Sequence, residues 1–229
     1  MLITGASHGI GLAIAHKMAS VGWQVIGIAR GGDRESFPGT LMACDLSNIG
    51  QTHTVLHLIS QNHHIDGIVN NVGIACPQPL ESVDLITLTQ VFDLNVRVAV
   101  QVTQHFIPQM RARRFGRIIN ISSRVVNGTA GRTAYAAAKS ALLGCTNTWA
   151  VELADSDITV NAILPGPIET AMFRKARPVG SAEEAKMLAT ILLNRFGTPE
   201  DVAEAAAYLL SDGAAYVTGQ HLGLDGGRR

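Results

Sequence analysis

The chain has 229 residues, of which 47% are hydrophobic and 16% are charged, and its formal net charge is zero. This composition excludes a disordered chain, and the zero net charge argues against a general attraction to nucleic acid or anionic membranes. The three cysteines, Cys44, Cys76 and Cys145, are odd in number and widely spaced, which argues against a disulfide framework or a structural zinc site.

Short β-rich apolar runs alternate with helical stretches along the chain. Strands are expected at residues 2–3, 24–29, 41–44, 65–70, 117–121, 158–164 and 221–224, and helices at 10–20, 49–60, 85–110, 135–153 and from 198 onward. This alternation predicts a doubly wound, mainly parallel α/β sheet of seven strands with helices on both faces. The sequence has no linker or repeat, so residues 1–229 are expected to form a single domain.

The first residues already have a strand pattern, so we expect no signal peptide before the fold. No uncharged apolar run has the length needed to span a bilayer. These two features favour a cytoplasmic protein.

A glycine-rich turn, Thr4-Gly5-Ala6-Ser7-His8-Gly9-Ile10-Gly11, joins the first strand to the first helix. Gly5 permits a tight turn, Gly9 lets the backbone approach a diphosphate, and Gly11 lets the helix pack closely on the sheet. The helix N-terminus adds unpaired N–H groups and the positive end of a dipole. Glycines alone also fit a simple turn, but this position between a strand and a helix favours a dinucleotide site.

Tyr135 and Lys139 lie four residues apart in a predicted helix, so their side chains share one face. A free phenol has a pKa of about 10, too high for a base near neutral pH, and a nearby ammonium lowers that pKa. The pattern alone fits an exposed helix pair equally well. The Tyr135 and Lys139 pair points to a catalytic site only together with other residues. These are Ser122 and Ser123 at the end of the preceding strand, and Asn95 in the helix before that strand.

These motifs together resemble the short-chain dehydrogenase/reductase family, across essentially the whole chain. The TGxxxGxG spacing, the segment Asn70-Asn71-Val72-Gly73 and the Pro165-Gly166 pair match family motifs in the family's order. The resemblance implies a Rossmann fold and hydride transfer between a nicotinamide and a carbonyl or secondary alcohol, without a metal. It assigns cofactor binding to Gly5, Ser7, His8, Gly9, Ile10, Gly11, Arg30, Asp45, Leu46, Asn71, Gly73, Tyr135, Lys139, Pro165, Gly166, Ile168 and Thr170.

The resemblance also assigns the catalytic roles. Tyr135 exchanges the proton, Lys139 lowers the pKa of Tyr135, and a serine orients the substrate oxygen. Aligned from the strand, that serine is Ser123, whereas counting back from Tyr135 gives Ser122 as the alternative. Asn95 matches the family asparagine whose backbone carbonyl holds a water near the lysine.

The end of the second strand indicates the preferred cofactor. NAD-specific folds usually carry an acid there, but this chain has Ala29 followed by Arg30. A guanidinium binds a 2′-phosphate, whereas an acid repels it. The sequence therefore favours NADP(H) over NAD(H), unless Arg30 is only a solvated surface residue.

The segment 171–195 is expected to form a substrate-binding lid. The chain is similar to 3-oxoacyl-carrier-protein reductases, and Arg114 and Arg174 fall where those enzymes carry basic residues that dock the acidic carrier. A 3-oxoacyl thioester on acyl-carrier protein or CoA is therefore one substrate class, and sugars, polyols, steroids and small ketones are the alternatives. The resemblance implies a homotetramer or dimer. A different kind of function, a dinucleotide sensor without turnover, is the remaining alternative.

Overall fold

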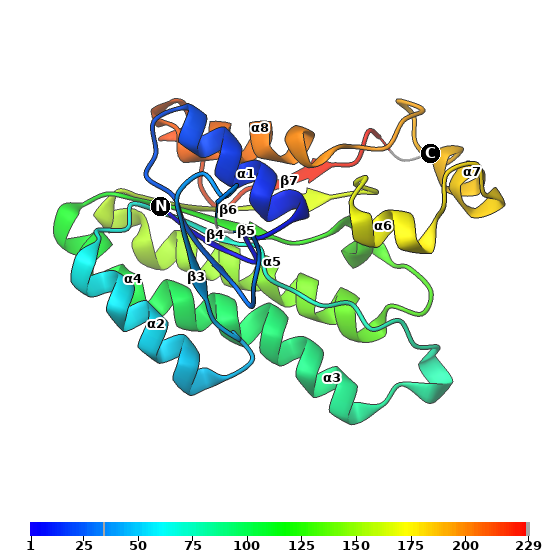
Figure 1. The fold of residues 1–229 in the computed structure, drawn as a ribbon, viewed down its shortest axis with the longest axis horizontal. Coiled ribbons are helices and arrows are strands. Elements are labelled where there is room, and N and C mark those ends of the chain that lie inside the picture. The colour runs from blue at the N-terminus through cyan, green and yellow to red at the C-terminus, as the bar shows by residue number, and fades with distance from the viewer. Residues whose placement is uncertain (34, 228–229) are drawn as a thin grey trace.

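The computed structural model describes residues 1–33 and 35–227, and within them seven strands form one parallel sheet (Figure 1). The strands are β1 (Leu2–Thr4), β2 (Ile26–Ala29), β3 (Thr40–Ala43), β4 (Gly67–Asn70), β5 (Gly116–Ile121), β6 (Ile158–Pro165) and β7 (His221–Leu224). Their order is β3-β2-β1-β4-β5-β6-β7, and every neighbouring pair is parallel. The doubly wound sheet predicted from the sequence is confirmed.

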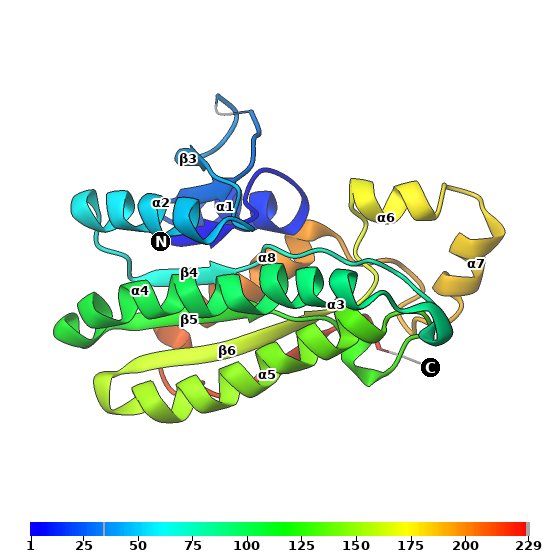
Figure 2. The same cartoon turned by 90° about the horizontal axis from the view of Figure 1, so that it is seen from below.

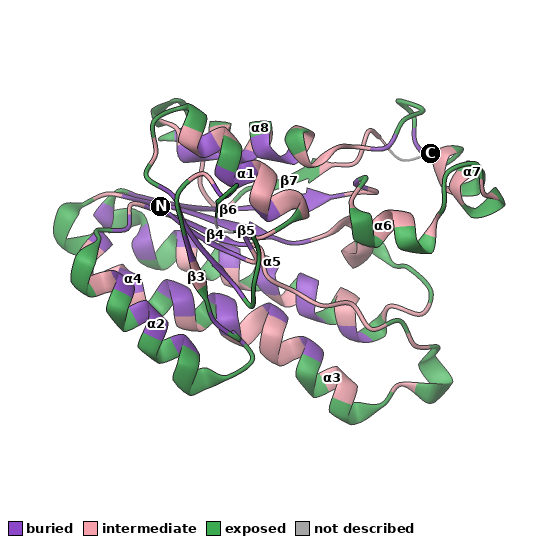
Figure 3. Cartoon of the chain, viewed as in Figure 1, coloured by how far each residue is buried: buried purple, intermediate pink, exposed green. Residues whose placement is uncertain are grey.

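Helices cover both faces of the sheet (Figures 1 and 2). On one face lie α1 (Gly9–Ser20) and α8 (Pro199–Leu210), and on the other lie α2 (Ile49–Asn62), α4 (Val98–Arg113) and α5 (Thr133–Leu153). A hydrophobic core lies on each face of the sheet. Successive side chains of a strand point to opposite faces, so Leu2 lies in one core and Ile3 in the other. Burial is accordingly continuous along the central strands (Figure 3).

Polar side chains define where several helices begin. Thr198 accepts from the N–H of Asp201, and the Asp201 carboxylate accepts from the N–H of Thr198. This reciprocal pair, with Pro199 in the first turn, confirms the predicted start of the last helix. In the same way Asn48 accepts from the N–H of Gln51 at the start of α2.

The long helix expected at 85–110 contains a local change of winding that the sequence did not predict. It begins with α3 (Leu85–Phe92), passes through a π-helical turn (Asp93–Arg97) and continues as α4. Within the turn, Asn95 donates its side-chain amide to the carbonyls of Val91 and Ile74. Such single π turns interrupt regular helices most often at functional sites.

This continuous helix, Leu85–Arg113, is long and apolar enough by length and composition alone to cross a membrane. The sequence analysis had found no such span, because it required a run without charges and this helix contains Asp93 and Arg97. In the structure Val98, Val102 and Phe106 pack in the core under the sheet. This packing accounts for only part of its apolar composition, since 28% of its apolar window is buried in the structure.

The segment 171–195 also contains structure that the sequence analysis did not assign. Two short helices, α6 (Ala171–Ala176) and α7 (Ala182–Leu188), stand at the edge of the molecule beyond the ends of the strands (Figure 2). Thr170 and Ser181 begin these helices by accepting from the N–H groups of Phe173 and Glu184.

Candidate active site

The predicted site residues gather at the carboxyl ends of the central strands. The strand order reverses between β1 and β4, because β2 and β3 lie on one side of β1 and the later strands lie on the other. Ligands of open parallel sheets bind at such a reversal, where loops leave the sheet toward opposite faces.

The glycine-rich turn has the geometry of an anion-binding loop. Gly5 and Gly9 have φ values of 67° and 56°, which favour glycine. A Cβ on Gly11 would lie 2.3 Å from the carbonyl oxygen of Gly5, so α1 is able to approach the turn only because Gly11 has no side chain. His8 at the N-cap makes no capping hydrogen bond through its side chain. The first-turn N–H groups of α1 therefore remain available to a diphosphate, so the residues fit a dinucleotide.

Thr4, which the sequence analysis had not singled out, locks this turn to the loop after β4. Its hydroxyl accepts from the N–H groups of Asn71 and Val72, at 3.0 and 3.1 Å. The Asn71 amide donates in return to the carbonyls of Thr4 and Gly5, both at 3.0 Å. These bonds hold Asn71 beside the glycine-rich turn, and its assignment to cofactor binding stays a prediction.

The segment 165–170, which the family resemblance places around the nicotinamide, lies against the glycine-rich turn. Thr170 is the nearest neighbour of a Cβ built on Gly9, with its methyl carbon at 3.4 Å. Ile168 is buried in the core and bridges to Gly197. Pro165 ends β6, and a Cβ on the next residue, Gly166, would lie 2.6 Å from the Cβ of Asp225.

At the ends of β2 and β3, where the family resemblance places the adenine end of the cofactor, Arg30 is exposed directly after β2. Asp45 accepts from the N–H and the hydroxyl of Ser47, at 3.0 and 2.8 Å, and these bonds lower the pKa of its carboxyl, with a smaller contribution from Arg30. Leu46 is buried under the sheet. The structure thus places Arg30 and Asp45 close enough to interact, at the ends of adjacent strands.

Lys139 is the most deeply buried charged group of the candidate site. Its side chain comes from α5, it is 2% exposed, and its ammonium donates to the carbonyl of Ile121 at 2.7 Å. Burial lowers the pKa of Lys139 to about 8. The ammonium lies 5.7 Å from the centre of the Tyr135 ring.

Burial dominates the surroundings of Tyr135 in this structure. The pKa of Tyr135 is raised, because burial disfavours the phenolate more than the Ser123 hydroxyl and the charge of Arg132 favour it. The expected lowering of the Tyr135 pKa by Lys139 stays a prediction.

The two candidate serines have different surroundings. Ser122 is buried and donates to the carbonyl of Lys139 at 2.8 Å. Ser123 is partly exposed, accepts from the N–H of Val125, and interacts with Tyr135. This geometry favours Ser123 as the serine that contacts a substrate oxygen and gives Ser122 a part in holding α5 against β5.

Asn95 completes the cluster from the π turn. It is 2% exposed, and its side-chain oxygen is a buried acceptor with no partner among the described residues. A Cβ built on Gly73 would lie 2.3 Å from this oxygen and 3.3 Å from the Lys139 ammonium. The acceptor and the ammonium therefore flank Gly73, an arrangement that suits a bridging water. The sequence analysis had assigned that role to the backbone carbonyl of Asn95.

The similarity of the chain to known proteins extends over nearly its whole length. Residues 5–229 match the family model described as Enoyl-(Acyl carrier protein) reductase. The chain is 39% identical to the 3-oxoacyl-(acyl-carrier-protein) reductase FabG of Thermotoga maritima, over 99% of this chain and 96% of the relative. It is 36% identical to the protein of the same name from Rickettsia prowazekii, over 99% and 95%. A solved structure of a candidate NAD(P)-dependent gluconate 5-dehydrogenase from Beutenbergia cavernae, with bound NADP at low occupancy, is 34% identical with a TM-score of 0.93, over 99% of this chain and 95% of that one.

The buried Lys139 ammonium predicts a specific dependence of stability on pH. Because burial lowers its pKa from 10.5 to about 8, the folded protein binds fewer protons than the unfolded chain between these values. The resulting stability is fully present above the unfolded pKa and is lost as pH falls through about 8. Relative to Lys139→Met, the free energy of unfolding of the wild type should rise by about 2 kcal/mol between pH 7.5 and pH 9.5, measured by urea unfolding.

The matched control is Lys186→Met, which replaces an exposed lysine of α7. Its difference from the wild type should stay constant over the same pH interval. Parallel pH profiles for the wild type and Lys139→Met would contradict the lowered pKa of Lys139.

Proposed function

The chain belongs to the short-chain dehydrogenase/reductase family and is an oxidoreductase, and we propose that it reduces a 3-oxoacyl thioester with NADPH, using Tyr135 as the proton donor. The observation that carries the proposal is the meeting of Tyr135, Ser123, Lys139 and Asn95 beside the anion-binding loop. The curated relatives named as 3-oxoacyl-(acyl-carrier-protein) reductases support the substrate class. The gluconate 5-dehydrogenase name of a similar structure keeps a sugar acid as the alternative.

The residues divide the chemistry as follows. When bound, NADPH supplies the hydride to the carbonyl carbon. Tyr135 donates its phenolic proton to the substrate oxygen, and its raised pKa keeps the phenol protonated at neutral pH. Ser123 donates a hydrogen bond to the same oxygen and stabilises the negative charge that develops there. Lys139 and Asn95 lie behind Tyr135, where they support its reprotonation.

We assign the cofactor as NADP(H) on the charge around its adenine end. The anion-binding loop and Thr170 surround the diphosphate side, and the residues at the ends of β2 and β3 surround the adenine. Arg30 is the exposed cation at this point, and no acidic residue occupies the position directly after β2. The NADP in the Beutenbergia structure supports this assignment.

The segment 171–195 is proposed to cover the substrate. Arg174 of α6 pairs with Glu169 before the helix and with Glu184 of α7, and its guanidinium lies over the rings of Phe173 and Phe196. These contacts hold the two lid helices together. They also neutralise Arg174, which weakens the expectation that it docks an acidic carrier. Arg114 pairs with Asp157 in an exposed position, where carrier docking would have to compete with that pair.

A homotetramer and a cytoplasmic location accompany this proposal. Large apolar side chains are exposed on the outer helices, including Leu85, Ile86 and Val151, and Tyr216 is exposed near the C-terminal strand. Exposed apolar side chains of this size are typical of subunit interfaces when they gather into a patch, so these residues are candidates for contacts between like chains.

Tyr135→Phe tests the proposed reaction. NADPH oxidation is followed with acetoacetyl thioesters of pantetheine, CoA and acyl-carrier protein, with gluconate-type ketoacids and small ketones in parallel. We expect turnover of the thioesters by the wild type and a loss of at least about 1,000-fold in kcat for the variant, because the phenol that donates the proton is removed. Tyr208→Phe, at an exposed tyrosine of α8, is the control and should turn over normally. Equal activity of Tyr135→Phe would contradict the mechanism, and turnover of ketoacids alone would replace the substrate class.

The two serines give a second, independent prediction. Ser123→Ala should lower kcat by about 100-fold with little change in stability, because it removes an oxygen-stabilising donor. Ser122→Ala should instead lower the free energy of unfolding by about 1 kcal/mol through the lost bond to Lys139. Steady-state kinetics and urea unfolding of both variants measure the difference, and the reversed pattern would make Ser122 the substrate-contacting residue.

Arg30→Asp tests the cofactor assignment. The change replaces a 2′-phosphate partner with a repelling charge, so the affinity for NADPH should fall by about 100-fold while that for NADH changes less than about threefold. Isothermal titration with both dinucleotides measures the ratio, and NADH serves as the internal control. An unchanged ratio would show that Arg30 does not contact the 2′-phosphate.

A further inference from the structure

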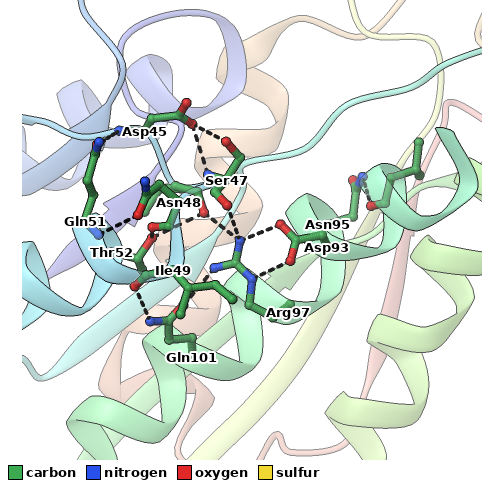
Figure 4. Close-up of polar contacts among 12 residues, drawn as sticks. Asp45, Ser47, Asn48, Ile49, Gln51, Thr52, Asp93, Asn95, Arg97 and Gln101 are labelled. Carbon is green, nitrogen blue, oxygen red and sulfur yellow. Dashed lines mark hydrogen bonds and ion pairs between the residues drawn. The ribbon is translucent and has the colours of Figure 1, made fainter. Parts of the chain in front are cut away.

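The loop that follows β3 is held by an arginine from the π-helical turn, more than forty residues away in the sequence. Arg97 donates to the carbonyl of Leu46 at 2.8 Å and to that of Ser47 at 3.3 Å. Its guanidinium is fixed by Asp93, which accepts from Nε and Nη2 at 2.7 and 2.6 Å, and by Gln101, which accepts from Nη1 at 2.7 Å. Figure 4 shows the guanidinium between Asp93 and the loop.

The same loop is also hydrogen-bonded to α2, the helix that follows it, so Arg97 adds to contacts that already hold the loop. Thr52 donates to the carbonyls of Leu46 and Asn48, and Gln101 donates to the carbonyl of Ile49. The loop carries Asp45, whose carboxylate is bonded to Ser47 (Figure 4). Fixing the Leu46 and Ser47 carbonyls therefore also fixes the direction of the Asp45 side chain.

The planar geometry of the guanidinium matters for this contact. Asp93 and Arg97 are only partly exposed, with 33% and 23% of their side-chain surfaces accessible. Because the guanidinium is planar, one N–H of Arg97 Nη2 points to the Asp93 carboxylate. The other N–H of Nη2 points to the carbonyls of Leu46 and Ser47. A lysine would present a point charge to the same carbonyls without this two-sided geometry.

Asn95 lies between these two residues on the same turn and takes part in the catalytic cluster. Its amide donates to Ile74 and Val91, and in Figure 4 it points away from the Arg97 guanidinium. The π turn thus presents one side chain to the loop after β3 and another to the site that contains Lys139.

We propose that Arg97 is a positioning residue for the adenine end of the cofactor, which acts by clamping the Leu46 and Ser47 carbonyls and so holding the loop that bears Asp45. The inference rests on the proposed function only for the identity of the ligand as an adenine dinucleotide. Without the clamp, the loop must be ordered when the nucleotide binds, and that ordering reduces affinity.

Binding of nucleotides that lack the nicotinamide tests this role separately from turnover. Adenosine 2′,5′-bisphosphate and ADP are titrated calorimetrically into the full-length wild type and into Arg97→Gln. The affinity of Arg97→Gln for the nucleotide that the wild type binds more tightly should fall by about tenfold, because two hydrogen bonds from a charged group to the loop are lost. Arg97→Lys should recover part of the loss. In kinetics, the KM for NADPH should rise by a similar factor, while kcat stays within about twofold.

Arg113→Gln is the matched control. It removes an arginine of the same helix that forms a 3.0 Å ion pair with Asp66, outside the clamp. Its nucleotide affinity should remain within about twofold of the wild type. Should Arg97→Gln fail to fold, Gln101→Ala removes one support of the clamp and should weaken nucleotide binding by about threefold.

Several outcomes would overturn the proposal. One is an unchanged nucleotide affinity in Arg97→Gln, and another is an equal loss of nucleotide affinity in Arg113→Gln. A third is a fall in the kcat of Arg97→Gln with unchanged nucleotide affinity, which would place the role of Arg97 in catalysis through Asn95. A wild type that binds neither nucleotide would also overturn it. A wild type that binds the nucleotide but reduces no carbonyl would overturn the proposed function and leave this inference intact.

Discussion

The burial of the Lys139 ammonium is the constraint on which the candidate site depends. A buried charge is tolerated only where polar groups surround it, and here the Ile121 carbonyl accepts from it at 2.7 Å. The side-chain oxygen of Asn95 lies nearby, and both groups approach Gly73 so closely that a Cβ there would lie 2.3 Å from that oxygen and 3.3 Å from the ammonium. The end of β5, the helix α5 and the π turn must therefore meet within a few ångströms. Ser122 ties α5 to β5 at that point through the Lys139 carbonyl.

The same requirement explains why a π turn stands in the middle of an otherwise regular helix. A regular α-helix at this place would move the side chain of Asn95 away from the carbonyls that it now reaches in α3 and in the loop after β4. The extra residue of the π turn also directs Arg97 toward the loop after β3. In the proposed site, one local irregularity thus serves both ends of the dinucleotide, the catalytic end through Asn95 and the adenine end through Arg97.

Local features of this chain were predictable from its sequence, whereas long-range ones were not. The sheet, the phosphate loop and the capping of α8 follow from patterns that extend over only a few residues, such as strand alternation, glycine spacing and Thr198 with Asp201. The π turn is accompanied by a bond from Asn95 to the carbonyl of Ile74, which lies 21 residues away in the sequence. The clamp joins Arg97 to Leu46 and Ser47, about fifty positions away in the sequence, so no short sequence motif predicts it. The burial that raises the pKa of Tyr135 is also a property of the folded protein, which the spacing of Tyr135 and Lys139 does not indicate.

The proposed function separates substrate choice from this chemistry in the structure. The catalytic cluster lies on the sheet and on long helices, while α6 and α7 pack as a small unit around Arg174. The partners of Arg174 are Glu184 within this unit and Glu169 and Phe196 beside it, so these contacts do not involve Lys139 or Tyr135. The proposed arrangement therefore assigns the proton and hydride chemistry to one part of the fold and recognition of the substrate to another. This explains how close relatives of the chain carry names that refer to both acyl thioesters and a sugar acid.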